Sequence, residues 1–237
     1  MEIPYLKRGW NRKSYLYHKI IQMKNLTLTL FFFLPYYCLA QVFEYVEEGN
    51  IHRIFKDDHY LVETVFSQDK GAFVLTRGGF YSSDGKAITV EFEFNSDYAT
   101  DGLKTKVYRQ EEAWKNVKVP DQDLGGKWLM AGRVKPEGEQ RRDLNRSRKT
   151  MKFLLDGYFQ WTAFDTASMA FKGCGGGTYT AQNGKYVETL QYFSRDDSKV
   201  GKILPFDYRL KEDDWYHKGF NSKGGPMHEI WHKRKLN

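Results

Sequence analysis

The amino-acid sequence predicts an all-β protein with two tandem antiparallel modules. Apolar and polar residues alternate through most of residues 150–193, and Asp156-Gly157 and Asn183-Gly184 interrupt the alternation. Such a pattern is typical of antiparallel strands joined by tight turns. A similar pattern occurs about 98 residues earlier. Aromatic residues make up 16% of the chain, and their wide side chains suit strands that enclose a barrel or a sandwich.

The first 40 residues are expected to be an upstream extension followed by a secretory signal peptide. A short positive segment begins at Met23, an apolar run follows at residues 26–34, and Cys38 and Ala40 occupy the −3 and −1 positions before Gln41. We therefore expect the mature chain to begin at Gln41 and to be exported, either to the periplasm or out of the cell.

Neither a lipid anchor nor a transmembrane span is expected in the mature chain. Lipidation at Cys38 normally requires a leucine three positions earlier, and Pro35 stands there. The apolar run is also shorter than the ~20 residues that a membrane-spanning helix needs.

Most of the positive charge belongs to this leader. Residues 1–40 carry six basic residues and one acidic residue, a net charge of +5, which leaves +2 of the chain's +7 for the remainder. A nearly balanced mature chain does not predict a nucleic-acid partner. Cleavage before Gln41 leaves Cys174 as the only cysteine, so an intramolecular disulfide is excluded and stability must come from packing.

Residues 41–120 are predicted to form a first, incomplete module. Its candidate strands are 42–47, 51–56, 59–66, 72–81, 87–95, 103–109 and 114–119. The sequence of residues 120–126 (PDQDLGG) contains turn and breaker residues without apolar alternation, which predicts a boundary between modules.

Residues 121–237 are predicted to form a second, complete module. Its candidate strands are 127–134, 149–155, 158–164, 169–180, 185–193, 202–210, 215–220 and 228–234. Between the first two of these strands, residues 135–148 are charged and contain glycine and proline, which is typical of an exposed loop.

The two modules match each other at an offset of about 98 residues. Phe55, Asp58, Tyr60, Thr64, Phe66, Phe73, Gly78-Gly79 and Tyr81 correspond to Phe153, Asp156, Tyr158, Thr162, Phe164, Phe171, Gly176-Gly177 and Tyr179. With a small drift, Tyr108-Arg109 and Trp114 match Tyr208-Arg209 and Trp215. The match predicts one supersecondary plan used twice. The first module has no counterpart to the strand at 228–234, so we expect it to be incomplete or closed differently.

The second module resembles a known protein family. The motif Gly126-Lys127-Trp128, with a closing strand that ends in Arg234, resembles the lipocalin and calycin pattern, where a Gly-x-Trp packs under a basic side chain of the last strand. The second module is similar to the small lipocalin-like domains of secreted Bacteroidetes proteins, mostly of unassigned function. The resemblance covers residues 125–236 and, more faintly, 43–119. It implies an up-and-down barrel whose interior can hold a small ligand.

Glu188 is the most informative candidate for function, because it lies on an apolar strand face that is expected to point inward. Ile88, Val90, Phe92 and Phe94 of the first module correspond to Tyr186, Glu188, Leu190 and Tyr192. An inward carboxylate is costly unless it is paired or hydrogen-bonded. Its partner is expected to be Arg133, Arg209, Arg234, a tyrosine or a ligand.

We predict a ligand site around Glu188 that aromatic and basic side chains complete, since tyrosine and tryptophan line pockets that need one polar contact. The predicted ligand-binding residues are Glu188, Tyr192, Tyr186, Trp161, Tyr179, Tyr208, Arg209, Trp128 and Arg234. An aromatic stripe of this kind is more often plain core.

Three other motifs resemble functional sites but also have a purely structural explanation. His228-Glu229-Ile230-Trp231-His232 matches the zinc-protease signature, but that chemistry needs a helix, and we expect a final barrel strand. Residues 173–177 (GCGGG) are followed by strand residues rather than by the helix of a phosphate loop. Cys174 is expected to be a small residue packed in the barrel wall. No catalytic residue, metal site or cofactor is predicted.

The sequence therefore predicts an exported protein that binds a small, mostly apolar ligand in the second module. The first alternative is a structural or interaction module of an envelope assembly, with both barrels filled by their own side chains. An enzyme is the least favoured alternative, either a zinc hydrolase at His228 and His232 or a lipocalin-type isomerase that uses Glu188.

Overall fold

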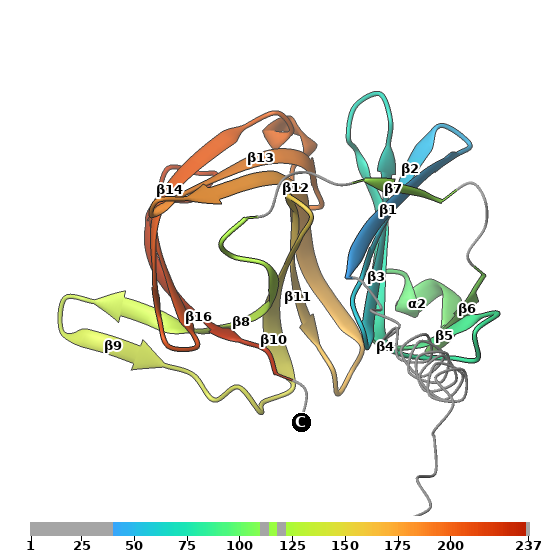
Figure 1. The fold of residues 1–237 in the computed structure, drawn as a ribbon, viewed down its shortest axis with the longest axis horizontal. Coiled ribbons are helices and arrows are strands. Elements are labelled where there is room, and N and C mark those ends of the chain that lie inside the picture. Colours follow the sequence, from blue (N-terminus) through green and yellow to red (C-terminus); the bar gives the residue numbers. More distant parts are fainter. Residues whose placement is uncertain (1–39, 110–113, 118–121, 236–237) are drawn as a thin grey trace, which may run out of the picture. The chain divides into compact units, whose positions relative to one another are not determined.

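The structure is a computed structural model that describes residues 40–109, 114–117 and 122–235 (Figure 1). The predicted upstream extension and signal peptide lie outside the described residues except for Ala40, so the mature start at Gln41 stays a prediction. No helix among the described residues is long and apolar enough to cross a membrane.

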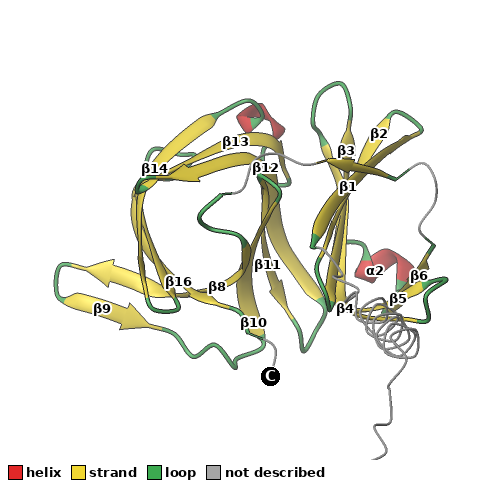
Figure 2. Cartoon of the chain, in the orientation of Figure 1, coloured by secondary structure: helices red, strands yellow, loops and turns green. Residues whose placement is uncertain are grey.

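The predicted all-β fold is confirmed, with two antiparallel sheets in the described part of the chain (Figure 2). The first sheet has the order β6-β5-β4-β3-β2-β1-β7. Its strands are β1 (Gln41–Glu47), β2 (Asn50–Lys56), β3 (Tyr60–Ser67), β4 (Phe73–Ser83), β5 (Ile88–Asn95), β6 (Thr105–Tyr108) and β7 (Lys115–Val117). A short helix, α2 (Tyr98–Asp101), connects β5 to β6.

The second sheet closes into an eight-stranded barrel because β10 pairs with both β11 and β8. Its strands are β8 (Gly126–Lys135), β10 (Arg148–Leu155), β11 (Tyr158–Asp165), β12 (Ala170–Gln182), β13 (Lys185–Phe193), β14 (Ile203–Lys211), β15 (Asp214–Phe220) and β16 (Pro226–Lys233). The ninth strand, β9 (Gly138–Arg141), pairs only with β8 and extends beyond the barrel (Figure 1). A single 3-10 turn, η1 (Asp197–Lys199), lies between β13 and β14.

The predicted turns have the backbone that two-residue hairpins need. Asp156 and Gly157 have φ values of 49° and 73°, and Asn183 and Gly184 have φ values of 52° and 76°. Positive φ at both central positions matches the twist of the flanking strands, and Asn-Gly and Asp-Gly tolerate it well. These turns fix the registers of β10 with β11 and of β12 with β13.

The first sheet repeats the strand pairing of the barrel at an offset of 98 residues. Ile88 pairs with Tyr108 as Tyr186 pairs with Phe206. The ladders shift register between Val65 and Phe66 and between Ala163 and Phe164, and again at Gly78-Gly79 and Gly176-Gly177. These coincidences support the predicted internal repeat. They also correct one detail, since Tyr108 corresponds to Phe206 and not to Tyr208.

The first sheet remains open, because no described strand joins β6 to β7. In the barrel, β15 fills the corresponding place between β14 and β16. Strand β7 lies beside β1 as β16 lies beside β8. By pairing, β7 takes the place of β16, whereas at the offset of 98 residues it aligns with the start of β15, so one strand of the plan has no counterpart among the described residues.

One face of the first sheet covers the barrel wall. Phe55, Tyr60, Val62 and Phe94 pack in one buried cluster with Met151, Phe153 and Phe164 of the barrel. Polar contacts cross the same interface: Thr64 Oγ1 donates to Gln160 Oε1 at 2.5 Å and Arg53 Nη2 donates to Gln191 Oε1 at 2.6 Å. The division at residue 120 into two domains stays a prediction, since residues 39–237 form one compact unit.

One end of the barrel is covered by the segment that leads into β8. Leu124 is fully buried in the barrel interior, and its carbonyl accepts a hydrogen bond from Trp128 Nε1 at 3.1 Å. The amide N–H of Asp123 donates to the carbonyl of Ala181 at 3.2 Å. We call the opposite end of the barrel, where β14 begins at Ile203 and β15 ends at Phe220, the rim.

Candidate functional site

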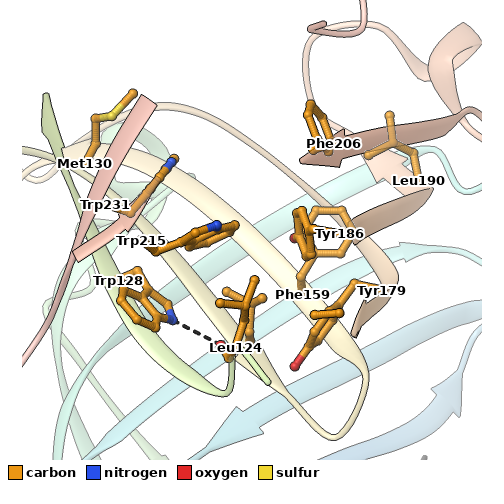
Figure 3. Close-up of a cluster of buried hydrophobic side chains, with 12 residues drawn as sticks. Leu124, Trp128, Met130, Phe159, Tyr179, Tyr186, Leu190, Phe206, Trp215 and Trp231 are labelled. Carbon is orange, nitrogen blue, oxygen red and sulfur yellow. Dashed lines mark hydrogen bonds between the residues drawn. The ribbon is translucent and has the colours of Figure 1, made fainter. Parts of the chain in front are cut away.

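The barrel interior is the candidate site, and large side chains line it (Figure 3). Its buried apolar cluster consists of Leu124, Trp128, Met130, Leu154, Phe159, Tyr179, Ala181, Tyr186, Leu190, Phe206, Trp215 and Trp231. Strand alternation explains this set, because every second residue of each strand points inward. The indole of Trp215 lies between those of Trp128 and Trp231, with centroid distances of 5.7 and 6.0 Å.

A buried ion pair lies among these rings. Lys152 of β10 donates from Nζ to Glu188 Oε1 at 2.6 Å, and Tyr186 donates its hydroxyl proton to the same oxygen at 2.9 Å. Lys152 and Glu188 are each only 4% exposed. At the offset of 98 residues, the first sheet has Ile54 and Val90 in their places. The ion pair is therefore specific to the closed barrel.

The ammonium group of Lys152 is surrounded by aromatic rings. Its Nζ lies 5.1 Å from the ring centroids of Tyr186 and Trp215, 5.2 Å from that of Trp231 and 6.0 Å from those of Phe159 and Phe206. Attraction of a cation to the ring faces compensates part of the cost of removing it from water. This arrangement explains how a lysine can remain at the centre of an apolar barrel.

Two further titratable groups extend the polar cluster toward the rim. His217 is fully buried, and its burial, with the charge of Lys152, holds its pKa well below the ordinary value of 6.5. Burial raises the pKa of Glu229, and Arg133 Nη2 lies 3.6 Å from its Oε1. We therefore assign a neutral imidazole to His217 at physiological pH.

Several nitrogen atoms of this cluster have no hydrogen-bond partner in the structure. They are Trp215 Nε1, Trp231 Nε1 and both ring nitrogens of His217. The carboxylate of Glu229 comes close to His217, but its Oε2 lies 3.8 Å from Nδ1, beyond hydrogen-bond distance. The indole N–H of Trp231 lies near Glu229 and offsets part of the rise in the pKa that burial causes. The two groups do not, however, have hydrogen-bond geometry. Buried polar atoms in proteins are almost always satisfied by protein, water or ligand. These nitrogen atoms are therefore the groups of the interior that remain available to a water or a ligand.

The structure brings six of the predicted residues to this interior. Trp128, Tyr179, Tyr186 and Glu188 are buried in it. Trp161 and Tyr208 are partly buried and pack against its margin. The Tyr208 hydroxyl donates to Asp123 Oδ2 at 2.5 Å, and burial together with this carboxylate raises the pKa of Tyr208 to about 12.

Tyr192 was expected on the inner face, and this prediction is wrong. Its ring stacks on Phe66 of the first sheet at a centroid distance of 4.7 Å, and its hydroxyl donates to Gln160 Oε1 at 2.7 Å. The cause is the register shift at Gly176-Gly177, where Gly176 pairs with Tyr192 and Gly177 pairs with Leu190. The extra residue, Gln191, reverses the alternation and directs Tyr192 outward.

The predictions for the arginines also require correction. Arg234 lies between barrel and first sheet, where it donates two hydrogen bonds of 2.8 Å to the carboxylate of Glu93. Arg209 is exposed, with its guanidinium 4.4 Å from the ring centroid of Tyr216. The basic group over Trp128 is Lys233, with Nζ at 4.5 Å from the ring centroid. The basic partner of Glu188 is therefore Lys152, and none of the arginines that were expected to pair with it does so.

Sequence reasoning missed Lys152, His217, Trp231 and Glu229. The alternation of apolar and polar residues does indicate that two of them face inward. Lys152 shares a strand face with the buried Leu154, and His217 shares one with the buried Trp215. Sequence order did not show that these faces meet at the barrel centre. That meeting depends on the ring closure between β8 and β10.

The competing motifs adopt the expected structural roles. His228 and His232 lie on strand β16, and His232 Nδ1 is 2.8 Å from Asp214 Oδ1, so the helical arrangement of a zinc protease is not formed. The GCGGG run lies inside strand β12. Cys174 is fully buried in the barrel wall beside Phe66, and burial raises the pKa of its thiol.

Comparison with known proteins gives no assignment. No protein-family model matches the chain, and a search of curated proteins finds no match.

Proposed function

We propose that this is an exported, lipocalin-like protein that binds a small, mostly apolar ligand inside its C-terminal barrel. The observation that carries the proposal is the set of buried nitrogen atoms without partners, on Trp215, His217 and Trp231, around the Lys152–Glu188 pair. A closed barrel with a polar group at its centre is an arrangement suited to holding and orienting one small molecule.

The class of ligand that we propose follows from the chemistry of the interior. Aromatic and aliphatic side chains form most of its surface, so an apolar body is favoured. The indole N–H groups of Trp215 and Trp231 can only donate hydrogen bonds, so the ligand needs an acceptor such as a carbonyl or hydroxyl oxygen. Lys152 and Glu188 neutralise each other, so an uncharged ligand group fits best.

The ligand would enter past the partly buried side chains near the rim. Phe193, Leu204 and Met227 pack against the interior cluster without being fully covered. Methionine is unbranched and readily changes rotamer. Movement of these side chains would open a path to Trp231 and His217.

A second candidate function is a structural module of a larger assembly, and the filled interior favours it. Twelve buried side chains occupy the barrel, and Glu188 already has two protein partners. In that case, the polar cluster holds only water or nothing, and the function lies on the surface.

Native mass spectrometry of the protein purified from the cells that naturally make it distinguishes these functions. We expect a bound small molecule on the wild-type protein. The double variant Lys152→Met/Glu188→Leu keeps the interior filled but removes its ion pair, and it should lose that molecule. Ligand-free protein, together with no saturable binding of any molecule in a lipophile screen, would exclude the binding function. Glu188→Gln serves in that screen as the variant with the smallest change in shape.

A further inference from the structure

The rim carries two large apolar side chains that point into solvent. Ile203 is 66% exposed and Phe220 is 62% exposed, the two largest values among the large apolar side chains of the described residues. Gly219 pairs with Phe206, so Phe220 and Ile203 come to the same end of the β14–β15 ladder. The interior positions on these strands are Phe206 and His217, so both side chains point outward.

Three exposed lysines lie beside this pair, in two segments that contain no carboxylate. Segments 201–206 and 216–228 contain Lys202, Lys218 and Lys223 and no aspartate or glutamate. All three lysines are exposed, and Lys202 Nζ donates to the carbonyl of Ser222 at 3.2 Å, which holds the two segments together. The nearest carboxylate on the ladder is Asp207, which lies opposite Lys218 and pairs with Lys185 at 2.5 Å. In the turn before Lys202, Asp196 pairs with Lys199 at 3.3 Å and Asp197 is exposed.

We propose that the rim docks onto an anionic lipid surface through Ile203 and Phe220, with Lys202, Lys218 and Lys223 contacting the head groups. Apolar side chains that insert at the head-group boundary, next to clustered lysines, give reversible binding to such surfaces. An anionic polysaccharide would use the lysines but would gain little from an exposed isoleucine and phenylalanine. The two apolar side chains therefore favour lipid.

This orientation would place the rim, past which a ligand would enter, against the lipid. The docking does not depend on the proposed ligand, since none of the five side chains belongs to the barrel interior. Vesicle binding and ligand binding can therefore fail separately.

The test is co-sedimentation of the chain from Gln41 onward with vesicles of phosphatidylcholine, with and without phosphatidylglycerol. We expect at least a roughly tenfold preference for the anionic vesicles. The variants Ile203→Ser/Phe220→Ser and Lys202→Glu/Lys218→Glu/Lys223→Glu should each lose about tenfold or more in binding. Circular dichroism checks that each variant remains folded.

Strand β14 offers a matched control at its other end. Leu210 is 47% exposed and is followed by the exposed Lys211, and Leu210→Ser/Lys211→Glu should bind like the wild type. The proposal is overturned if the wild type ignores anionic vesicles, or if this control loses as much as the rim variants. Retained binding by the Ile203→Ser/Phe220→Ser variant would also overturn it, as would tighter binding of the wild type to soluble dextran sulfate than to the anionic vesicles.

Discussion

At the scale of single residues, the central feature is a buried ion pair in a barrel that could have been apolar. The first sheet shows the apolar alternative, with Ile54 and Val90 where the barrel has Lys152 and Glu188. Buried ion pairs rarely increase stability over apolar residues of similar size, because both charges lose hydration. The presence of this pair at the centre of the aromatic cluster therefore favours a role in binding over a role in stability.

Removing one member of the ion pair should lower the free energy of unfolding much more than removing both. Lys152→Met leaves Glu188 as a buried carboxylate without its cation, and we expect a loss of about 3–5 kcal/mol in the free energy of unfolding. Lys152→Met/Glu188→Leu should recover most of that loss. Urea denaturation of the single and double variants measures both values. Additive losses in the double variant would show that the two side chains do not interact.

Buried His217 should make the protein less stable in mild acid. Its folded pKa lies well below 6.5, whereas the unfolded chain binds a proton near pH 6.5. Below that pH, the unfolded state therefore binds more protons, and the free energy of unfolding falls as the pH decreases. Between pH 7.5 and pH 5.5, this group should contribute a loss of roughly 1 kcal/mol.

The variant His217→Phe isolates that contribution, because phenylalanine keeps a ring in the same place and does not titrate. Its free energy of unfolding should decline less than that of the wild type over the same pH interval. Equal declines in urea denaturation at the two pH values would assign the acid sensitivity to other groups.

Sequence alone identified Glu188 because a carboxylate interrupts an otherwise apolar strand face. It could not identify Lys152 as the partner, since the two residues are 36 positions apart and meet only across the barrel. Lys152 also looked ordinary, because lysine is common on strands that alternate between solvent and core. Which residues meet across a closed barrel depends on the strand register and on the ring closure of the sheet. The amino-acid composition gives no information on either.

At the scale of elements, the bulges decide which side chains face the interior. Strand β13 follows simple alternation through Tyr186, Glu188 and Leu190, and the prediction was correct there. Beyond the register shift, Tyr192 points to the first sheet. Sequence alternation continues without interruption through this point, so only the paired glycines at 176–177 indicated a change in geometry.

Glycine 177 should not tolerate a side chain. A Cβ atom there would overlap the carbonyl oxygen of Thr189 on the neighbouring strand. The neighbouring backbone cannot move without breaking the ladder, so Gly177→Ala should cost about 1–3 kcal/mol or more. Thermal unfolding measures the loss. Gly125→Ala is the control, because a Cβ atom at Gly125 meets no atom within 4 Å, and equal losses in both variants would contradict the steric account.

At the scale of the whole molecule, one face of the first sheet packs against the outside of the barrel. Polar groups hold the two together: Arg234 and Glu93 form two hydrogen bonds of 2.8 Å, and Arg53 is buried between Glu44 and Gln191. The sequence predicted two similar modules in tandem. It gave no sign that one face of the first would cover the second, because the residues of this interface resemble ordinary core.

Unfolding should therefore be a single transition. The change in tryptophan fluorescence, which reports mainly on the barrel, should coincide with loss of the β-sheet signal in circular dichroism. Glu93→Gln weakens the contact with Arg234 and should lower both midpoints together, with a loss of about 1.5–3 kcal/mol. Two separate transitions, or a shift in only one probe, would show that the sheets unfold independently.

We propose that the barrel centre holds a ligand at the indole N–H groups that have no hydrogen-bond partner. Nuclear magnetic resonance of ¹⁵N-labelled tryptophan side chains tests this claim, in protein taken directly from its natural producer and in the same protein after unfolding, washing and refolding. We predict that the Trp215 and Trp231 signals move, while the Trp128 signal stays because Leu124 already accepts its hydrogen bond. Superimposable spectra before and after this treatment would contradict the account.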